Sequence, residues 1–438
     1  MARVLLIAFH YPPVGGPSAQ RTLHLTRQLT LRGHEVVVVT GPGVSDYLWT
    51  PFDESTSALI PDVRVHRLSG PVPSQSRGLR RIGERVLQLD PPFRRWFDTE
   101  LVQAVAGLGL PRPDVVLGEI VPYDTATGIV DAVRQTGAPW IADLHDPWAL
   151  DEMWIYPTAL QRLADRRRMR RVLRSAAAVV MNTSEAAARV RSAFPELGKR
   201  VHGIPMGFDP SDFEAPREAT PDGIFRIVHT GTMYTEEGLR HRRTRRIRRL
   251  LGGMPNPTVD FLPRSHVYLL RALAVLEQRD ASLVAPVEVH LAGAMTVGDR
   301  EVAASSRRTV VHGFVSHADT MALVGSADLL FLPMHAMDGR AGLVPTKTYE
   351  YLGSGRPILA AVPDGDAREL MEACGTATAV YPDDVQGMAR VIEQHVLRWR
   401  AGEDPPALDA AVAAGYTWES IGNRVADVIE DVVGRTRS

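Results

Sequence analysis

Short apolar runs alternate with longer stretches of helical periodicity along the chain. Apolar runs bounded by Gly, Pro or polar residues are typical of buried strands in parallel sheets. A first series of predicted strands comprises Val4–Phe9, Glu35–Thr40, Val63–Leu68, Val115–Glu119, Trp140–Leu144, Ala178–Asn182 and Val201–Ile204. A second series comprises Phe225–His229, Val287–Ala292, Thr309–His312, Asp328–Leu332, Pro357–Ala361 and Ala377–Tyr381. The alternation predicts an α/β chain whose parallel sheets carry helices on both faces.

The intervals between these strands carry helical patterns, of which the clearest are Ala19–Arg32, Asp124–Gln135, Gln161–Ser175, Val267–Gln278 and Val385–Arg398. The Pro- and Gly-containing spacer Pro205–Asp222 separates the two series. We therefore expect two doubly wound domains, 1–207 and 223–405, joined by a linker at 208–222. A ligand cleft between them would lie beyond the carboxyl ends of the strands. Residues 406–438 should carry an amphipathic helix, Thr417–Val433, that packs back on the first domain.

Composition narrows the class of protein. The 438 residues suffice for two or three domains with full cores, and 45% hydrophobic with 23% charged residues is ordinary for a soluble globular protein. A net charge of −1 argues against a general nucleic-acid binder. The single Cys374 and the absence of zinc-type spacing favour a reducing cytoplasm. Arg3–Phe9 has the pattern of a first strand rather than a signal peptide, and no stretch has the length of a bilayer span.

One segment after an apolar run has the pattern of an anion site. Residues 345–357 read P-T-K-T-Y-E-Y-L-G-S-G-R-P, and Pro345 and Thr346 offer an entry to a short helix. The N–H groups at such an entry bind anions. Lys347 and Glu350 are three positions apart and share one face, which suits a ligand with phosphate at one end and vicinal hydroxyls at the other, such as a sugar nucleotide. An ordinary surface ion pair would give the same spacing.

The turn after the first predicted strand is a weaker signal. It reads H-Y-P-P-V-G-G, and the adjacent Gly15 and Gly16 would let the backbone approach a ligand closely. It is not a G-x-G-x-x-G fingerprint, so a dinucleotide is not expected. A plain turn explains the two glycines equally well.

Five segments occur in an order that resembles glycosyltransferase family 4: His10–Gly16, Trp140–Trp148, Gly203–Asp209, Glu350–Pro357 and Tyr416–Glu419. The resemblance covers nearly the whole chain and is closest to the branch that reads P-x-K-x-x-E-Y. It implies the GT-B fold, two facing Rossmann-like domains. It also implies a nucleotide-sugar donor, retention of anomeric configuration and no required metal or other cofactor.

The resemblance also implies roles for individual residues. Glu350 would bind the ribose hydroxyls of the donor, for which an acceptor-only carboxylate is suited. The other donor-binding positions would be Gly15, Gly16, Gly231, Thr232, Phe314, Val315, Gly342, Leu343, Thr346 and Lys347, with Phe314 and Val315 against the nucleobase. His145 would contact the transferred sugar, although a bond to neighbouring backbone is the plainer alternative for it. Asp146 could orient the imidazole or cap the next turn, and Trp148 could shape the loop or stack on a sugar ring.

The sequence departs from the family pattern at two positions. Gly342 stands where the first motif glutamate is expected, and Thr232 stands in place of an arginine. Asp338, just upstream, could substitute for the glutamate, although a solvated loop acid is the plainer alternative for it. Cations for the diphosphate would then come from Lys347, Arg340, Arg356 or an Arg-rich insertion at 236–265.

The insertion carries a dense run of arginines: Arg240, Arg242, Arg243, Arg245, Arg246, Arg248 and Arg249. Such a run is usually solvated or disordered. It could instead act as a mobile lid over the diphosphate, or as an anchor to anionic lipid or an anionic acceptor. A second basic pattern lies in the first domain, at Arg162, Arg166–Arg168, Arg170, Arg171 and Arg174.

The leading hypothesis is a retaining, hexosyltransferase-like enzyme. It would move a sugar from a nucleoside-diphosphate sugar, with UDP favoured, to an acceptor hydroxyl in polysaccharide, glycolipid or metabolite biosynthesis. The alternatives are a sugar-nucleotide epimerase or phosphorylase on the same fold, and a non-catalytic donor-binding partner protein. The expected setting is the cytoplasm, at or near the inner face of the membrane, with no nucleic-acid partner and no metal.

Overall fold

The computed structural model describes residues 1–44, 50, 52–73, 78, 83–84, 91–109, 111–214 and 222–437. The chain divides into two compact units. Unit 1 comprises Met1–Met206, Arg248–Pro255 and Trp418–Ser438, and unit 2 comprises Gly207–Ile247 and Asn256–Thr417. Residues 215–221 of the expected linker at 208–222 lie outside the described residues. Residue 438, the last of the expected C-terminal segment 406–438, also lies outside them. Residues 248–255 belong to unit 1, whereas the sequence-based bounds placed them in the second domain.

Unit 1 is built on a parallel sheet of seven strands in the order β3-β2-β1-β4-β5-β6-β7. The strands are β1 (Arg3–Ala8), β2 (Glu35–Thr40), β3 (Arg64–Arg67), β4 (Val115–Glu119), β5 (Trp140–Leu144), β6 (Ala178–Met181) and β7 (Val201–Gly203). Each agrees with a strand predicted from the apolar runs to within about two residues. Runs rich in Val, Ile and Leu, as in the central β1 and β4, form strands that are buried on both faces.

The helices described in unit 1 begin and end at recognisable signals. They are α1 (Pro17–Leu31), α3 (Pro92–Gly107), α4 (Ala126–Thr136), α5 (Ala159–Ser175), α6 (Ser184–Ala193) and α16 (Trp418–Arg437). Pro17 occupies the first turn of α1, where its missing N–H costs nothing. The hydroxyl of Thr183 accepts a hydrogen bond from Ala186 N (2.9 Å) and caps α6. Gly137 ends α4 in the left-handed conformation.

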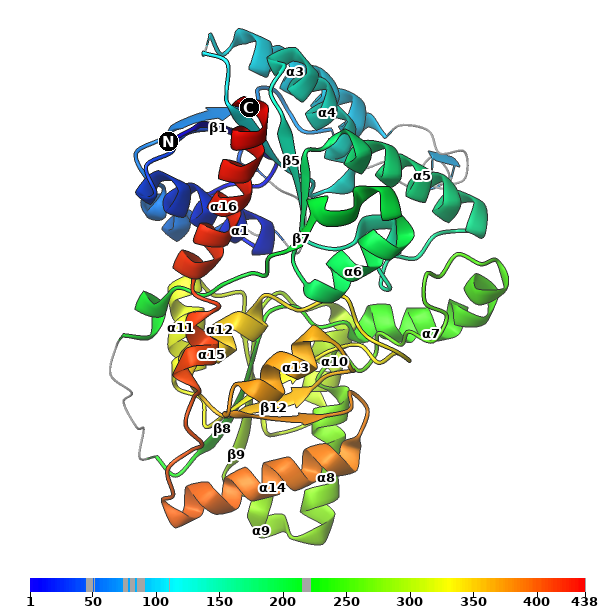
Figure 1. Cartoon of the computed structure of the whole chain (residues 1–438). Helices are drawn as coiled ribbons and strands as arrows, with labels where there is room; N and C mark the ends of the chain where they lie inside the picture. The colour runs from blue at the N-terminus through cyan, green and yellow to red at the C-terminus, as the bar shows by residue number, and fades with distance from the viewer. Residues whose placement is uncertain are drawn as a thin grey trace. The chain divides into compact units, whose positions relative to one another are not determined.

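The C-terminal helix α16 packs against α1 (Figure 1). The ring of Trp418 stacks on His24 with centroids 4.6 Å apart. Gly422 faces Gln28 so closely that a Cβ at Gly422 would collide with the glutamine side chain. The close approach of the two backbones therefore depends on this glycine. On the exposed side of the same contact, Arg32 pairs with Asp427 (2.6 Å) and Glu430 (3.1 Å).

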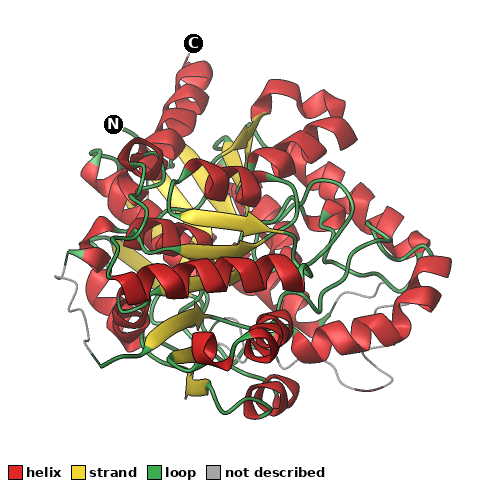
Figure 2. Ribbon diagram, turned by 90° about the horizontal axis from the view of Figure 1, so that it is seen from below, coloured by secondary structure: helices red, strands yellow, loops and turns green. Residues whose placement is uncertain are grey.

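Unit 2 contains a parallel sheet of six strands in the order β10-β9-β8-β11-β12-β13. The strands are β8 (Phe225–Thr230), β9 (Val287–Ala292), β10 (Thr309–Gly313), β11 (Leu329–Pro333), β12 (Ile358–Ala361) and β13 (Ala377–Val380). Its helices are α8 (Val267–Arg279), α9 (Ala281–Val284), α10 (Val297–Ala304), α11 (His317–Gly325), α12 (Lys347–Ser354), α13 (Asp366–Ala373), α14 (Val385–Ala401) and α15 (Ala410–Ala414). Helices pack along the strands (Figure 2).

The Arg-rich segment forms a regular helix, α7 (Thr235–Leu250), and not the disordered run that its composition suggested. The helix is stabilised through its sparse apolar face, since Gly238 and His241 are buried. His241 Nε2 lies 2.9 Å from Val259 O, and Arg242 pairs with Asp260 at 2.6 Å. Fixed partners of this kind give the helix one preferred position within unit 2.

Both sheets have the same connectivity reversal. The first strand of each sheet, β1 or β8, lies between the second and fourth strands of that sheet. In doubly wound folds, ligands bind beyond the carboxyl ends of the strands at this reversal point. The loops that follow β1, β4 and β5 in unit 1, and β8, β9 and β11 in unit 2, are therefore the places to look for a site.

Candidate functional site

The carboxyl ends of three neighbouring strands in unit 1 carry polar residues that the sheet register brings together. His10 follows β1, Glu119 ends β4 and His145 follows β5. Glu119 is aligned with Asp143 in the β4–β5 pairing, so His145 begins just beyond it. Burial is nearly complete at all three residues, whose exposed fractions are 4%, 1% and 8%.

A chain of short contacts links these residues through Ser18 on α1. Ser18 Oγ donates to Glu119 Oε1 at 2.5 Å, and His10 Nδ1 lies 3.2 Å from the same hydroxyl oxygen. His145 Nε2 lies 2.9 Å from Glu119 Oε1. Among the described residues, neither His10 Nε2 nor Glu119 Oε2 has a hydrogen-bond partner. Buried polar atoms are nearly always paired, so these two atoms indicate a ligand at this edge of the sheet.

Burial shifts the pKa values of Glu119 and His10 in opposite directions. Burial raises the pKa of Glu119, and the contacts with His145 and Ser18 offset only part of the rise. Burial, together with the nearby His145, lowers the pKa of His10 to about 4. His10 is therefore neutral at physiological pH, and the Glu119 carboxyl group holds a proton more readily than an exposed glutamate.

A buried ion pair supports the floor of this site. Arg21 Nε and Nη2 donate to the two carboxylate oxygens of Asp143 at 2.8 and 3.0 Å, and Nη1 donates to Pro205 O at 2.9 Å. The side chains are 0% and 2% exposed. This bidentate geometry fixes α1, which carries Ser18, against β5, which leads to His145.

The structure constrains the expected roles of the loop that begins at His145. The side chain of His145 lies against the Glu119 carboxylate rather than against backbone alone. Asp146 is partly exposed, and its carbonyl oxygen accepts a long hydrogen bond from Tyr123 Oη (3.4 Å). Trp148 is 0% exposed, stacks on Tyr123 with centroids 5.3 Å apart and donates from Nε1 to Asp165 (2.9 Å). Trp148 thus shapes the loop, and its ring is covered where a sugar would have to stack.

Gly15 and Gly16 lie in the loop between β1 and α1, at the same edge of the sheet as His10. Gly16 has a φ of 93°, a conformation that favours glycine, and directly precedes Pro17. Its neighbour Gly15 is buried.

In unit 2, the loop after β8 and the start of α12 come together around Lys347. Lys347 Nζ lies 3.1 Å from His229 Nε2, while His229 Nδ1 lies 2.9 Å from Phe331 O. Burial lowers the pKa of His229, so the neutral imidazole donates from Nδ1 to the carbonyl and accepts from the lysine. Gly231 has a φ of 93°, and a Cβ there would lie 2.9 Å from Lys347 Nζ. The absence of a side chain at Gly231 therefore leaves room for the ammonium group of Lys347.

The positive charge at this place comes from two residues. Burial and the nearby Arg264 lower the pKa of Lys347 to about 7, and Glu350 opposes this shift. Arg264 accepts a backbone hydrogen bond at its carbonyl from Tyr234 N (3.0 Å), and its guanidinium lies 4.6 Å from the centroid of the Tyr234 ring. The loop after β8 therefore holds Arg264 beside the lysine. Two cations in one partly buried place favour a polyvalent anion.

The remaining donor-binding candidates lie on loops at the same edge of this sheet. Thr346 directly precedes α12, Glu350 lies in its first turn and is partly buried, and Leu343 is 9% exposed. Gly342 is buried in the loop that follows β11. Thr232 follows Gly231 after β8. Phe314 and Val315 follow β10, and the Phe314 side chain is 51% exposed.

The structure places the other proposed cations elsewhere. Arg340 pairs with Glu369 (2.7 Å) and Asp366 (3.6 Å). Arg356 precedes β12 and so lies at the amino end of that strand, away from Lys347. Asp338, proposed as a substitute for the missing glutamate, is exposed on the loop after β11. Sequence reasoning did not single out Arg264 as a cation of the site, although this residue lies within the Arg-rich insertion at 236–265.

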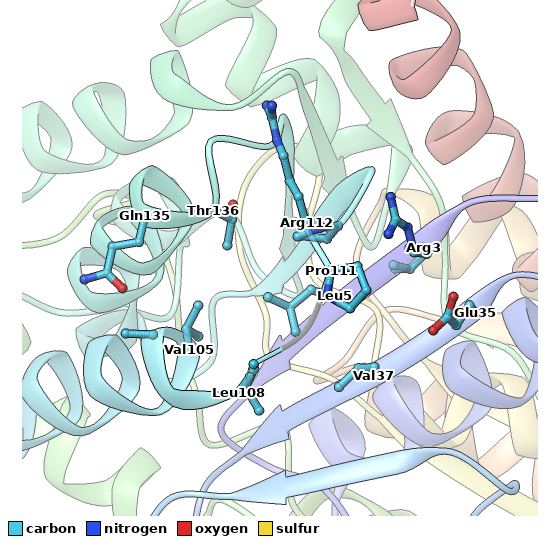
Figure 3. Close-up of a pocket in the computed structure, with 14 residues that line it drawn as sticks. Arg3, Leu5, Glu35, Val37, Val105, Leu108, Pro111, Arg112, Gln135 and Thr136 are labelled. Atoms are coloured by element: carbon cyan, nitrogen blue, oxygen red, sulfur yellow. The ribbon is translucent and has the colours of Figure 1, made fainter.

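One pocket of unit 1 lies away from this edge of the sheet. A pocket of about 430 Å³ is lined by residues at the amino ends of the strands, among them Arg3, Glu35 and Thr136 (Figure 3). Leu5, Val37, Val105 and Leu108 form its apolar wall. It lies at the far end of the strands from His10, Glu119 and His145.

Two kinds of feature are absent from the described residues. In the described ranges, no three or more His, Cys, Asp and Glu side chains are grouped as metal ligands would be. Within the same part of the chain, no helix combines the length and the apolarity needed to span a bilayer.

Comparison with known protein families gives one match. Residues 16–207 match the family described as "Glycosyl transferase 4-like domain". This stretch, which is similar to that family, contains Ser18, Glu119 and His145 of the site described above, while His10 lies just before it. No curated protein matches the chain.

Several solved structures share the fold over almost the whole chain. HepE from Anabaena, in complex with UDP and glucose, has 15% identity and a TM-score of 0.57, covering 98% of this chain and 100% of that one. A glycosyltransferase from Rickettsia africae has 12% identity and a TM-score of 0.61, covering 99% of both chains. A putative UDP-N-acetylglucosamine 2-epimerase from Listeria monocytogenes has 12% identity and a TM-score of 0.58, covering 99% of this chain and 98% of that one. The chain therefore has the GT-B fold, two Rossmann-like units on parallel sheets.

Proposed function

We propose that this protein is a retaining glycosyltransferase that moves a sugar from a nucleoside-diphosphate sugar, most simply a UDP-sugar, to an acceptor hydroxyl. The observation that carries the proposal is the position of Lys347. It lies over Gly231, beside His229 and Arg264, at the reversal point of the six-stranded sheet. The glycosyl transferase 4-like domain and the UDP complexes of the structural relatives support it.

Within this proposal, the residues of unit 2 bind the donor. Lys347 and Arg264 neutralise the diphosphate, and Thr346 with the first N–H groups of α12 binds a phosphate oxygen. Gly342 and Leu343 offer backbone N–H groups to the same group. Glu350 accepts hydrogen bonds from the ribose hydroxyls. The exposed Phe314 ring, with Val315, contacts the nucleobase, and Gly231 and Thr232 keep the approach to the diphosphate open.

The residues of unit 1 act on the transferred sugar and the acceptor. His145 contacts the sugar through the ring atoms not turned to Glu119, and Asp146, Gly15 and Gly16 line the approach. Fixing a histidine and an acid in place lowers the entropy cost of bringing the two substrates together. The leaving diphosphate, neutralised by Lys347 and Arg264, takes the acceptor proton. The reaction needs no metal in this scheme, and its setting is the cytoplasm.

The proposal is tested by titration of the protein with a panel of nucleotide sugars, followed by transfer assays with the donor that binds. We expect UDP-sugars to raise the melting temperature, since a ligand that binds the native state stabilises it. Glu350→Ala should weaken binding of a UDP-sugar by about tenfold or more, because it leaves buried hydroxyl groups unpaired. An unchanged dissociation constant would remove Glu350 from the site. Activity that survives EDTA would agree with the metal-independent scheme.

A sugar-nucleotide epimerase is a second candidate, favoured by one observation. Sequence reasoning found few acid–base groups, whereas the structure gathers His10, Glu119 and His145 at one sheet edge. Such a group of titratable residues could move a proton to and from a sugar carbon. Incubation with the donor alone in D₂O separates the two candidates. An epimerase incorporates deuterium into the recovered sugar nucleotide, whereas a transferase leaves it unlabelled or hydrolyses it slowly.

A further inference from the structure

Helix α5 of unit 1 carries an exposed stripe that its packing does not explain. Met169, Val172 and Leu173 turn toward the core. On the opposite face, Leu160, Leu163, Arg167 and Arg171 follow one another at spacings of three and four residues, which places them in one line. The two leucines are 76% and 43% exposed. Two aliphatic side chains thus continue into two arginines along a single exposed face.

A second pair of exposed leucines is fixed next to the start of this stripe. Leu250 and Leu251, which are 87% and 47% exposed, belong to the part of unit 1 that ends α7. Ala159 N donates to Leu251 O at 2.8 Å, and Tyr156 N donates to Gly253 O at 2.9 Å. A Cβ at Gly252 would lie 2.9 Å from Ala159 Cβ, so the close contact depends on that glycine. The Leu250–Leu251 tip is therefore held against the first turn of α5.

The arginines of the stripe lack the contacts that hold their neighbours Arg166 and Arg170. Arg170 pairs with Glu196 at 2.6 Å, and the Arg166 guanidinium lies 5.7 Å from the Phe194 ring centroid. No such ion pair or ring contact holds Arg167 or Arg171 in the described part of the chain, and both residues are exposed. Leu160, Leu163, Arg167, Arg171, Leu250 and Leu251 together form what we call the leucine–arginine surface.

We propose that the leucine–arginine surface docks on an anionic phospholipid bilayer. The leucines would enter the boundary between headgroups and acyl chains, and the unpaired guanidinium groups would bind lipid phosphates. A nucleic acid would satisfy the arginines but would leave the exposed leucines in water. The combination of four exposed leucines with two uncompensated cations therefore favours a lipid surface. The inference does not depend on the proposed reaction, because binding to lipid needs no sugar nucleotide.

The test is flotation of the full chain with vesicles of phosphatidylcholine alone and of phosphatidylcholine with phosphatidylglycerol. We expect binding only to the anionic vesicles, and weaker binding as salt is raised. Each arginine near such a surface contributes about a fivefold factor, so R167S/R171S should weaken binding by about twenty-five-fold. L250S/L251S should weaken it by about tenfold or more through the lost apolar insertion.

Matched controls separate this surface from general stickiness. Leu31, at the end of α1, is 76% exposed, the same fraction as Leu160, but lies outside the leucine–arginine surface. L31S should therefore bind vesicles as strongly as the native chain does, whereas L160S should bind them more weakly. Failure of the native chain to float with anionic vesicles would overturn the proposal, as would equal binding by L160S and L31S. Retention on RNA or DNA that depends on the two arginines but not on the leucines would assign the surface to nucleic acid instead.

Discussion

His145 Nε2 lies 2.9 Å from Glu119 Oε1, although Glu119 ends β4 and His145 follows β5 of the seven-stranded sheet. The same carboxylate oxygen accepts a hydrogen bond from the Ser18 hydroxyl group at 2.5 Å. Glu119 therefore fixes the orientation of the imidazole, much as an acid orients a catalytic histidine. In the proposed reaction, Glu119 acts through His145 and is a positioning residue.

The first prediction concerns this carboxylate. Glu119→Gln keeps the volume but removes the charge beside His145, so we expect kcat to fall by about tenfold or more with little change in KM for the donor. The pH profile of kcat should change as well, since the substitution removes a titratable carboxyl group whose pKa is raised by burial. Steady-state kinetics across pH checks both effects. Glu152→Gln is the control, because Glu152 is equally buried and pairs with Arg189, away from His145. Equal losses in the two variants would mean that Glu119 has only a structural role.

The second prediction is a pH dependence of donor binding. Because the pKa of Lys347 is lowered to about 7, the side chain carries its charge below that pH and loses it above. Affinity for a UDP-sugar should therefore fall as pH rises through 7 and beyond. A UDP-sugar suits this test better than UDP, whose terminal phosphate itself titrates at about pH 6.

Calorimetry in buffers of different ionisation enthalpy measures the effect, and we expect proton uptake on binding at pH 8. Lys347→Arg should bind with little pH dependence, since a guanidinium stays charged throughout this range. A flat pH profile for the native protein would show that Lys347 does not face the diphosphate.

The strands could be predicted from sequence because parallel sheets buried on both faces leave continuous apolar runs. The runs β1 and β11 are such cases, since nearly all of their residues are buried. The start of α12 could also be predicted, because its signals are local in the sequence. Pro345, Lys347 and Glu350 lie within six residues of one another. Signals of this kind are contained in one short segment.

The rest of the site depends on contacts between segments far apart in the chain. Ser18 and Glu119 are 101 residues apart, and Lys347 and His229 are 118 apart. The one available hint was that Glu119 and His10 each stand at the carboxyl end of a predicted strand. The sequence suggested that the Arg-rich segment is disordered, whereas it forms the helix α7. Its order comes from contacts such as the pairing of Arg242 with Asp260, which composition does not reveal.

The third prediction tests whether Gly231 is needed for Lys347. Gly231→Ala places a Cβ 2.9 Å from Lys347 Nζ, too close for the ammonium to keep its position. We therefore expect a displaced lysine and donor binding weakened by about tenfold. Gly402→Ala is the control, since Gly402 also has a positive φ (67°) but nothing within 4 Å of the added Cβ. Both variants should lose about 1 kcal/mol of stability from the backbone strain. Only Gly231→Ala should lose affinity in a titration, and similar affinities in the two variants would contradict the assignment.

The fourth prediction concerns the buried pair of Arg21 and Asp143, whose side chains are 0% and 2% exposed. Arg21→Met leaves the Asp143 charge buried without its partner, which costs about 3–5 kcal/mol in the free energy of unfolding. Replacing both residues with apolar side chains, in R21M/D143L, should restore much of that loss because no charge then remains buried.

Urea denaturation measures these free energies, with the exposed Arg134–Asp131 pair as the control. The Arg134 and Asp131 side chains are 73% and 44% exposed, so Arg134→Met should cost less than about 1 kcal/mol. If Arg21→Met costs no more than Arg134→Met, the buried pair does not hold α1 against β5. In that case the position of Ser18 beside Glu119 must be set by the packing of α1 alone.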